Sequence, residues 1–241
     1  MIKQNVPVII GKKQQKTKEV FRKKALETKS ELFYASSIVK LSRFKSTFGK
    51  RSSFKLKHGG KTTKLKTDLI GNYQQENIQT AIAAIFYLKK KKILKIKKTA
   101  IFKGIRNIQK DSYFIGRNMI LATKPLIIAD SAHNVAGIKE LVTQINAISY
   151  EKLHFVYGTV SDKDVATIFT LLPKEAQFYF CKPAIIRGME TDSIEKIAHE
   201  FNFNYKSFDS VNNALLVARK NANENDLIII GGSIFVVAEA F

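Results

Sequence analysis

The sequence is poor in cysteine and contains no long apolar run. Cys181 is the only cysteine, which excludes an intrachain disulfide and a zinc site built from cysteines, and favours a reducing compartment. Because Cys181 ends the apolar run 178–181, we interpret it as a buried structural thiol. The longest apolar run, 227–238, is shorter than the roughly 20 residues that span a bilayer, and the apolar start is too short for a signal peptide. We therefore expect a cytoplasmic protein without a membrane partner.

Acidic residues are also scarce, with 20 Asp and Glu against 41 Lys and Arg, so the formal net charge is +21. Such a charge attracts nucleic acid, but only seven of the basic residues are arginine, the type that favours bidentate recognition of phosphates and bases. Tryptophan is absent, and the other aromatics lie mostly in apolar runs rather than among basic residues. The lysines concentrate in the first 110 residues. We expect no specific nucleic-acid partner, although a noncatalytic polyanion-binding module stays open as an alternative.

The apolar pattern divides the 241 residues into two parts. After residue 110, continuous apolar runs alternate with segments of helical periodicity, which is typical of a doubly wound, mostly parallel, Rossmann-like α/β domain. The strand-like runs are 125–130, 154–158, 177–181 and 227–230. Before residue 110 the pattern predicts a short buried strand at 6–11, a helix at 17–28, a small antiparallel patch within 31–70 with a turn at 58–60, and a helix at 77–88.

Candidate binding residues follow the predicted parallel strands, because ligands of open α/β sheets bind at the carboxyl ends of the strands. After the first strand come Asp130, a potential acceptor for ribose hydroxyls, His133, a potential phosphate donor or proton shuttle, and Asn134, a potential helix cap. Loops 158–164, 182–187 and 231–233 fall at the same edge, and Ser161 with Asp164 resembles a capping box for a helix at about 163–172. Ordinary turns, caps and solvated side chains would explain each of these segments equally well.

Several segments, in their order along the chain, resemble the successive signatures of the folylpolyglutamate synthase/dihydrofolate synthase family, a branch of the Mur ligase superfamily. They are Gly71-Asn72-Tyr73-Gln74-Gln75-Glu76-Asn77, Gly116-Arg117, Asp130-Ser131-Ala132-His133-Asn134, Asp162-Lys163-Asp164 and Gly231-Gly232-Ser233. The Asp-x-Ala-His-Asn segment is the most specific of them. The resemblance extends over essentially the whole chain.

This resemblance implies an ATP-dependent amide ligase that activates a folate carboxylate as an acyl phosphate, which the amino group of glutamate then attacks. Its partners would be ATP, glutamate and dihydropteroate or a reduced folate. The resemblance assigns catalysis to Arg117 and His133, which would contact the ATP phosphates. It also assigns ATP binding to Asn77, on the adenine side, and to Asp130, at the ribose, and places Ser233 near the substrate.

The sequence departs from the family in lacking a P-loop, since no G-x-x-x-x-G-K-[ST] motif occurs. The nearest segment is Gly49-Lys50-Arg51-Ser52, with Phe44 in place of the first glycine. We therefore expect the Mg²⁺ ligands in a missing N-terminal half and no metal ligand here. The chain would comprise a truncated remnant of the central ATPase domain, 1–110, and the complete C-terminal ligase domain, 111–241.

Two smaller departures affect the nucleotide pocket. Asn118 follows the Gly-Arg pair where the family usually has an aromatic residue, and Ser131 replaces the more usual residue after the aspartate. We expect the isolated chain to be inactive and a separate N-terminal P-loop polypeptide to be its candidate partner. A fragment of another Mur-type ligase is a further alternative.

Overall fold

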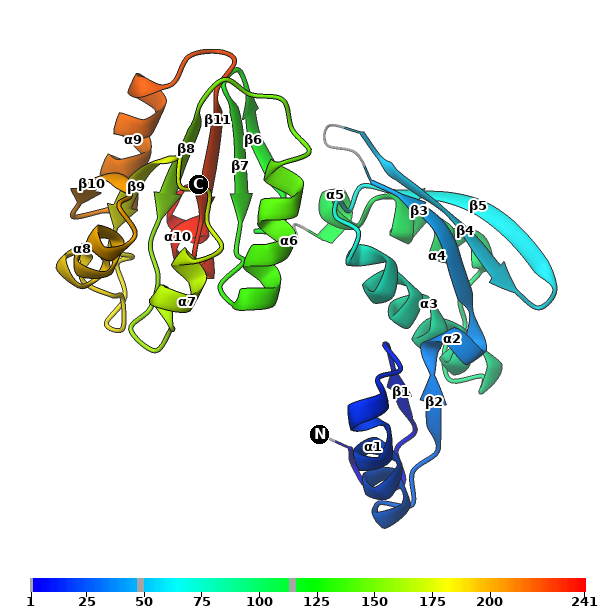
Figure 1. Ribbon diagram of the computed structural model, residues 1–241. Coiled ribbons are helices and arrows are strands. Elements are labelled where there is room, and N and C mark those ends of the chain that lie inside the picture. The colour runs from blue at the N-terminus through cyan, green and yellow to red at the C-terminus, as the bar shows by residue number, and fades with distance from the viewer. Residues whose placement is uncertain (1, 47–49, 113–115) are drawn as a thin grey trace. The chain divides into compact units, whose positions relative to one another are not determined.

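The computed structural model describes residues 2–46, 50–112 and 116–241, which form two compact units divided between residues 113 and 114 (Figure 1). The second unit is built on a six-stranded sheet in the order β10-β9-β8-β11-β7-β6, in which only β6 runs antiparallel to its neighbour. This confirms the doubly wound, mostly parallel fold. The strands are β6 Met119–Thr123, β7 Leu126–Asp130, β8 Leu153–Tyr157, β9 Gln177–Cys181, β10 Asn204–Phe208 and β11 Leu227–Gly231.

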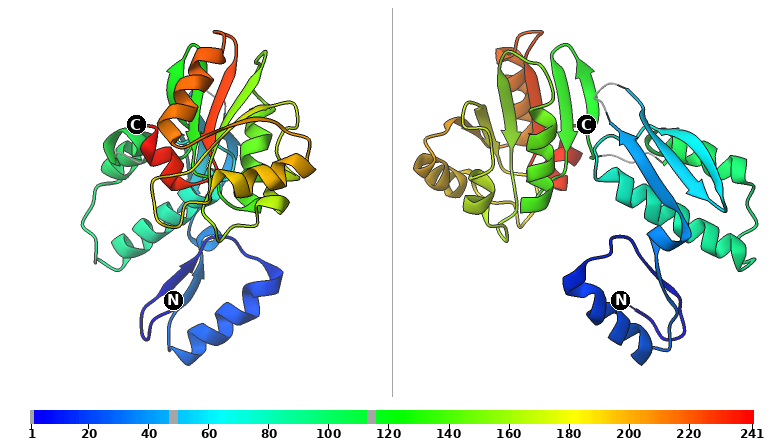
Figure 2. Two further views of the ribbon diagram at one scale, coloured as in Figure 1. Left: turned by 90° about the vertical axis from the view of Figure 1, so that its left-hand side faces the viewer. Right: turned by 45° about the vertical axis from the view of Figure 1, so that its right-hand side comes forward.

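Helices cover both faces of this sheet, so the central strands are apolar on both sides. One face carries α6 Val135–Ile145, α7 Val165–Phe169 and α8 Thr191–Glu200, and the other carries α9 Val211–Asn221 and α10 Ile234–Glu239 (Figure 2). Tyr179 and Cys181 pack beneath α9 and α10. Cys181 is a buried free thiol, as predicted, and burial together with Glu239 raises its pKa to about 12.

The two edge strands, β6 and β10, were not predicted. β10 combines polar and aromatic residues and has no continuous apolar run, whereas β6 carries the short apolar run 119–122, which we did not interpret as a strand. The helix predicted at about 163–172 is also shorter, Val165–Phe169. The edge strand β10 depends on backbone pairing with β9 more than on its own hydrophobicity, which explains why the apolar pattern does not reveal it.

A buried polar cluster holds the amino-terminal edge of the sheet together. His154 on β8 joins the Tyr179 hydroxyl through Nδ1 (2.9 Å) and the Asp226 carboxylate through Nε2 (3.2 Å). Asp226 also accepts hydrogen bonds from the backbone N–H groups of Lys152 (3.0 Å) and Asn223 (2.8 Å). Burial alone would raise the pKa of Asp226, but these donors together outweigh burial and lower it. The cluster therefore satisfies its buried polar groups internally.

The first unit contains a two-stranded parallel sheet and a three-stranded antiparallel sheet, β3-β4-β5. The antiparallel sheet confirms the predicted patch, and the predicted turn joins β4 to β5 through Gly59 and Gly60, both at positive φ. The strand predicted at 6–11 is shorter, and it is half-buried rather than buried. The elements are β1 Val8–Ile10, α1 Gln15–Glu27, β2 Leu32–Tyr34, α2 Ala35–Ile38, β3 Lys40–Lys45, β4 Ser52–His58, β5 Lys61–Thr67, α3 Gln74–Lys90, α4 Lys98–Arg106 and α5 Ile108–Ser112.

The core of this unit forms where α3 and α4 meet the antiparallel sheet, with Phe54, Ile82 and Ile101 among its buried residues. The segment that most nearly imitates a P-loop ends at the first residue of β4. Gly49 lies outside the described residues, whereas Ser52 begins β4 and its hydroxyl donates to the Leu69 carbonyl (2.7 Å).

Across the described parts of both units, none of the helices combines the length and hydrophobicity of a transmembrane span.

Candidate functional site

The parallel strands of the second unit direct several loops to one edge of the sheet. The chain passes from β7 through α6 to β8, while β11 occupies the position between these two strands. The connections after β7 and β11 leave toward opposite faces, since α6 and α10 cover different sides. This arrangement is a topological switch point, where open α/β sheets bind ligands. The predicted loops after β7, β8, β9 and β11 all follow carboxyl ends at this edge.

Asp130 organises the turn after β7. Its Oδ1 accepts a hydrogen bond from the Ala132 N–H (2.8 Å), and its Oδ2 accepts one from the Asn118 N–H (2.9 Å). The side chain of Asn134 caps α6 by accepting from the Gly137 N–H (2.9 Å), as predicted. The carboxylate of Asp130 therefore supports the turn itself, and its assignment to ribose binding stays a prediction.

His133 projects from this turn and is half-buried. Its Nδ1 lies 2.9 Å from the Ser131 carbonyl oxygen. Because a carbonyl only accepts hydrogen bonds, Nδ1 carries the proton, and this bond orients the ring. Nε2 is then the atom that can accept a proton or, once protonated, donate to an anion.

Arg117 lies beside the same turn. The Ser131 N–H donates to the Gly116 carbonyl (2.8 Å), which joins the Gly-Arg segment to the turn, and an Arg117 guanidinium nitrogen lies 3.7 Å from Asp130 Oδ1. The Arg117 side chain is 34% exposed and that of Asp130 only 5% exposed. Arg117 and His133, which the sequence separates by 16 positions, are thus attached to one hydrogen-bonded turn.

Asn118 is a structural residue that the sequence analysis treated only as a departure from the family. It adopts a left-handed backbone conformation with φ 50°, which asparagine tolerates better than aromatic residues do, and it is 1% exposed. This conformation directs its N–H to Asp130. The left-handed preference of asparagine was the available sequence signal.

Burial dominates the electrostatics of Asp130. It raises the pKa of the carboxyl, while the N–H groups of Ala132 and Asn118 and the charge of Arg117 act in the opposite direction. Keeping the carboxyl group of Asp130 ionised in this buried position therefore costs free energy. The positive charge of Arg117 partly offsets that cost.

Ser233 lies at the same edge, directly after β11, and is 4% exposed. Its hydroxyl accepts from the Phe235 N–H (3.2 Å) and caps α10. Gly232 before it has φ +93°, and a Cβ there would lie 2.5 Å from the Gly158 carbonyl oxygen and 2.7 Å from Cε2 of Tyr157. This close packing explains the glycine, and the assignment of Ser233 to substrate binding stays a prediction.

The loops after β8 and β9 pair with each other. Asp164 caps α7 through the Thr167 N–H (3.0 Å) and hydroxyl (2.6 Å), which lower its pKa. The Ser161 hydroxyl instead faces the Arg187 carbonyl (3.4 Å), so the predicted capping box is wrong. The Arg187 guanidinium lies 5.4 Å from the ring centroid of Phe235, a cation–π contact that the sequence did not indicate.

Asn77 belongs to the first unit, on the first turns of α3. It is exposed, and its Nδ2 donates to Gln74 Oε1 (3.1 Å). The structure thus brings together Arg117, Asp130 and His133 at one turn, with Ser233 at the same edge of the sheet. The role assigned to Asn77 stays a prediction.

Comparison with known proteins links the second unit to a family. Residues 116–234 match the family described as Mur ligase, glutamate ligase domain. The chain is 30% identical over 180 residues to a probable bifunctional folylpolyglutamate synthase/dihydropteroate synthase of Haloferax volcanii, an alignment that covers 74% of this chain and 20% of that protein. It is 29% identical over 165 residues to the dihydrofolate synthase/folylpolyglutamate synthase of Escherichia coli, covering 68% of this chain and 36% of that protein.

Solved structures share the fold over nearly the whole chain. Folylpolyglutamate synthase of Mycobacterium tuberculosis, complexed with ADP and AMPPCP, superposes with a TM-score of 0.81 at 20% identity, covering 98% of this chain and 54% of that one. Escherichia coli FolC in complex with DHPP and ADP gives a TM-score of 0.77 at 24% identity, covering 99% and 53%. The chain therefore spans about half the length of these structures and a smaller share of the curated relatives.

Proposed function

We propose that this chain, whose residues 116–234 match the Mur ligase glutamate ligase domain, is the C-terminal portion of an ATP-dependent ligase that joins glutamate to dihydropteroate or a folate. The remnant of the central ATP-binding domain would be residues 1–110, and the ligase C-terminal domain residues 111–241. The observation that carries the proposal is the turn after β7, where Asp130 holds the segments bearing Arg117 and His133 together. Relatives named as folate ligases, solved with adenine nucleotides, support it.

In the proposed reaction, a carboxylate oxygen of the folate attacks the γ-phosphorus of ATP and the bond to ADP breaks. The amino group of glutamate then attacks the acyl carbon, phosphate leaves, and the nitrogen loses a proton. Negative charge accumulates on the transferred phosphoryl group, so fixed positive charge beside it accelerates the step. Arg117 supplies such a charge.

The two other residues of this turn have supporting roles. His133, with Nδ1 bound to the Ser131 carbonyl, presents Nε2 to an incoming phosphate oxygen. Asp130 accepts hydrogen bonds from the backbone next to Arg117 and next to His133, and so would orient these two residues. Its remaining lone pairs would accept hydrogen bonds from the ribose hydroxyls. Asn77, in the first unit, would contact the adenine.

This chain's own residues do not fit Mg²⁺. Within residues 2–46, 50–112 and 116–241, no group of three His, Cys, Asp or Glu side chains could hold a metal ion. The sequence also has no P-loop to enclose the β and γ phosphates. We therefore propose that a P-loop segment, supplied by another polypeptide, holds the metal. On this proposal the 241-residue chain alone neither hydrolyses ATP nor extends a folate.

Nucleotide binding tests the proposed site without requiring turnover. We expect ADP to bind the chain weakly in calorimetry, and Arg117→Gln to weaken binding by about tenfold through loss of one charge-assisted contact. Arg219→Gln is the matched control, because Arg219 is an exposed arginine on α9 of the same unit. Equal affinities for wild type and Arg117→Gln would contradict the assignment.

Reconstitution tests the ligase activity. The chain would be mixed with the N-terminal P-loop half of the Escherichia coli relative, and ADP release followed with tetrahydrofolate and glutamate present. Release that requires both polypeptides and both substrates supports the proposal. Ligation by the 241-residue chain alone would contradict the assignment of the phosphate and metal sites to another polypeptide.

A further inference from the structure

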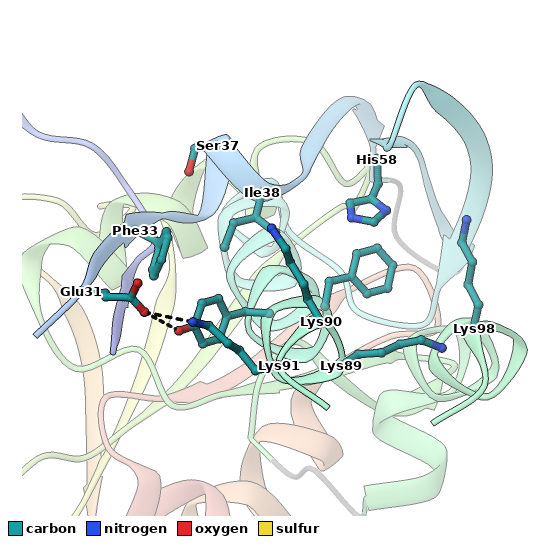
Figure 3. Close-up of a pocket in the computed structure, with 11 residues that line it drawn as sticks. Glu31, Phe33, Ser37, Ile38, His58, Lys89, Lys90, Lys91 and Lys98 are labelled. Carbon is teal, nitrogen blue, oxygen red and sulfur yellow. Dashed lines mark hydrogen bonds and ion pairs between the residues drawn. The ribbon is translucent and has the colours of Figure 1, made fainter. Parts of the chain in front are cut away.

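A groove of about 930 Å³ lies in the first unit, at the end of α3 opposite to Asn77 (Figure 3). Lysines form its rim: Lys89 and Lys90 end α3, Lys91 follows, and Lys98 begins α4. The floor is apolar and includes Phe33, Ile38 and Phe86. Arg117, Asp130 and His133 are not among the described residues that line the groove.

Positive charge dominates this groove. Of the described residues that line it, four are lysines and only Glu31 is acidic. Glu31 is already engaged, because its carboxylate accepts from the Tyr87 hydroxyl (2.9 Å) and pairs with Lys91 (3.4 Å), as the dashed lines of Figure 3 show. The other three ammonium groups have no carboxylate within the groove. Lys89 donates to the Ile96 carbonyl (2.6 Å), which occupies one of its three N–H groups.

His58 connects the charged rim to the apolar floor. Its ring lies 4.3 Å from that of Phe86, between centroids, and its pKa is lowered by burial and by the charge of Lys98. Low-dielectric walls beside unpaired charges strengthen the local potential. An anion bound beside Lys98 would therefore gain attraction and would relieve the repulsion that helps to lower the pKa of His58.

We propose that this groove binds the oligoglutamate tail of a folate substrate. The inference rests on the proposed function, which makes such a chain of carboxylates the substrate and the product. Each glutamate adds a carboxylate, so a tail of several residues can engage several ammonium groups at once, and the effective concentration strengthens each further contact. The apolar floor accommodates the methylene groups between the carboxylates.

The same features disfavour nucleic acid as the occupant. No arginine is among the described lining residues, and Phe86 and Tyr87 are only 7% and 9% exposed, so they offer little ring surface for stacking bases. Lysine ammonium groups on flexible stems suit single carboxylates well.

Calorimetry with γ-linked pentaglutamate tests the inference, using the full chain. The variant Lys90→Gln/Lys98→Gln should bind roughly tenfold more weakly, and the difference should shrink as salt rises. The matched control Lys16→Gln/Lys23→Gln removes two exposed lysines from α1 and the same charge, and should bind like wild type. Monoglutamate should bind far more weakly than pentaglutamate.

Histidine titration by NMR gives a second measurement on unmodified protein. Pentaglutamate should raise the pKa of His58 and leave the ring resonances of the other histidines unchanged. Absence of binding, equal weakening in both double variants, or equally tight binding of an oligothymidylate of the same charge would overturn the inference. ADP binding at Arg117 is measured separately, so either proposal can fail without the other.

Discussion

Replacing Asp130 by alanine tests whether this carboxylate holds the candidate site together. The change leaves two buried N–H groups, those of Asn118 and Ala132, without their acceptor. An unsatisfied buried donor costs about 1–3 kcal/mol. Two such donors would cost about 2–6 kcal/mol together. Alanine also removes the cost of burying the carboxylate, which is why burial raises its pKa, so we expect a net loss in the lower half of this range. The Arg117 contact, at 3.7 Å on a side chain 34% exposed, contributes less than about 1 kcal/mol. We expect a loss of about 2–4 kcal/mol.

Urea unfolding followed by circular dichroism measures this loss, and hydrogen exchange locates it. The Asn118 and Ala132 amides should exchange faster in Asp130→Ala, while amides of the first unit keep their protection. Asp130→Asn keeps one acceptor oxygen and should lose about half as much stability. Asn134→Ala is the control from the same turn, because it removes one exposed cap worth about 1 kcal/mol.

Two results would refute this reasoning about Asp130. One is a stability loss in Asp130→Ala smaller than that in Asn134→Ala. The other is unchanged exchange at both amides, which would mean that the turn keeps its shape without the carboxylate. Either result would leave Asp130 free for nucleotide binding alone.

Three further predictions concern the folded units. The pKa of Asp226 is lowered in the folded chain, so ionised Asp226 stabilises the fold above the unfolded pKa of about 3.9, and this stabilisation is lost as pH falls through the folded pKa. The urea midpoints of wild type and Asp226→Asn should therefore differ at pH 6 and converge in acid. Gly232→Ala should lower the free energy of unfolding by about 2–4 kcal/mol in the same assay, because its Cβ would lie 2.5 Å from the Gly158 carbonyl oxygen and φ is positive. The control Gly104→Ala, which has open space in α4, should be neutral or stabilising. Similar losses in the two variants would contradict the packing argument. Cys181 should resist a disulfide reagent at pH 8 until urea unfolds the second unit, given its burial and its pKa of about 12, and rapid labelling of the native chain would contradict this.

Local pattern was sufficient for the four central strands of the second unit, β9, β8, β11 and β7. Strands such as β11 consist of apolar residues buried on both faces, and that requirement leaves a continuous apolar run in the sequence. Local chemistry also predicted the cap at Asn134 and the turn at Gly59 and Gly60, since each depends on residues within a few positions.

Other features arise from contacts between distant segments and have no local pattern. The β10 strand exists through pairing with buried β9, and Asp130 receives one of its two donors from a segment twelve positions away. The lysine-rimmed groove combines Glu31, His58 and Lys98, which only the packing of α3 and α4 against the strands brings together. Hydrophobic periodicity therefore specified the layers of the fold and local chemistry specified its caps, while long-range packing determined the surroundings of Asp130 and the make-up of the groove.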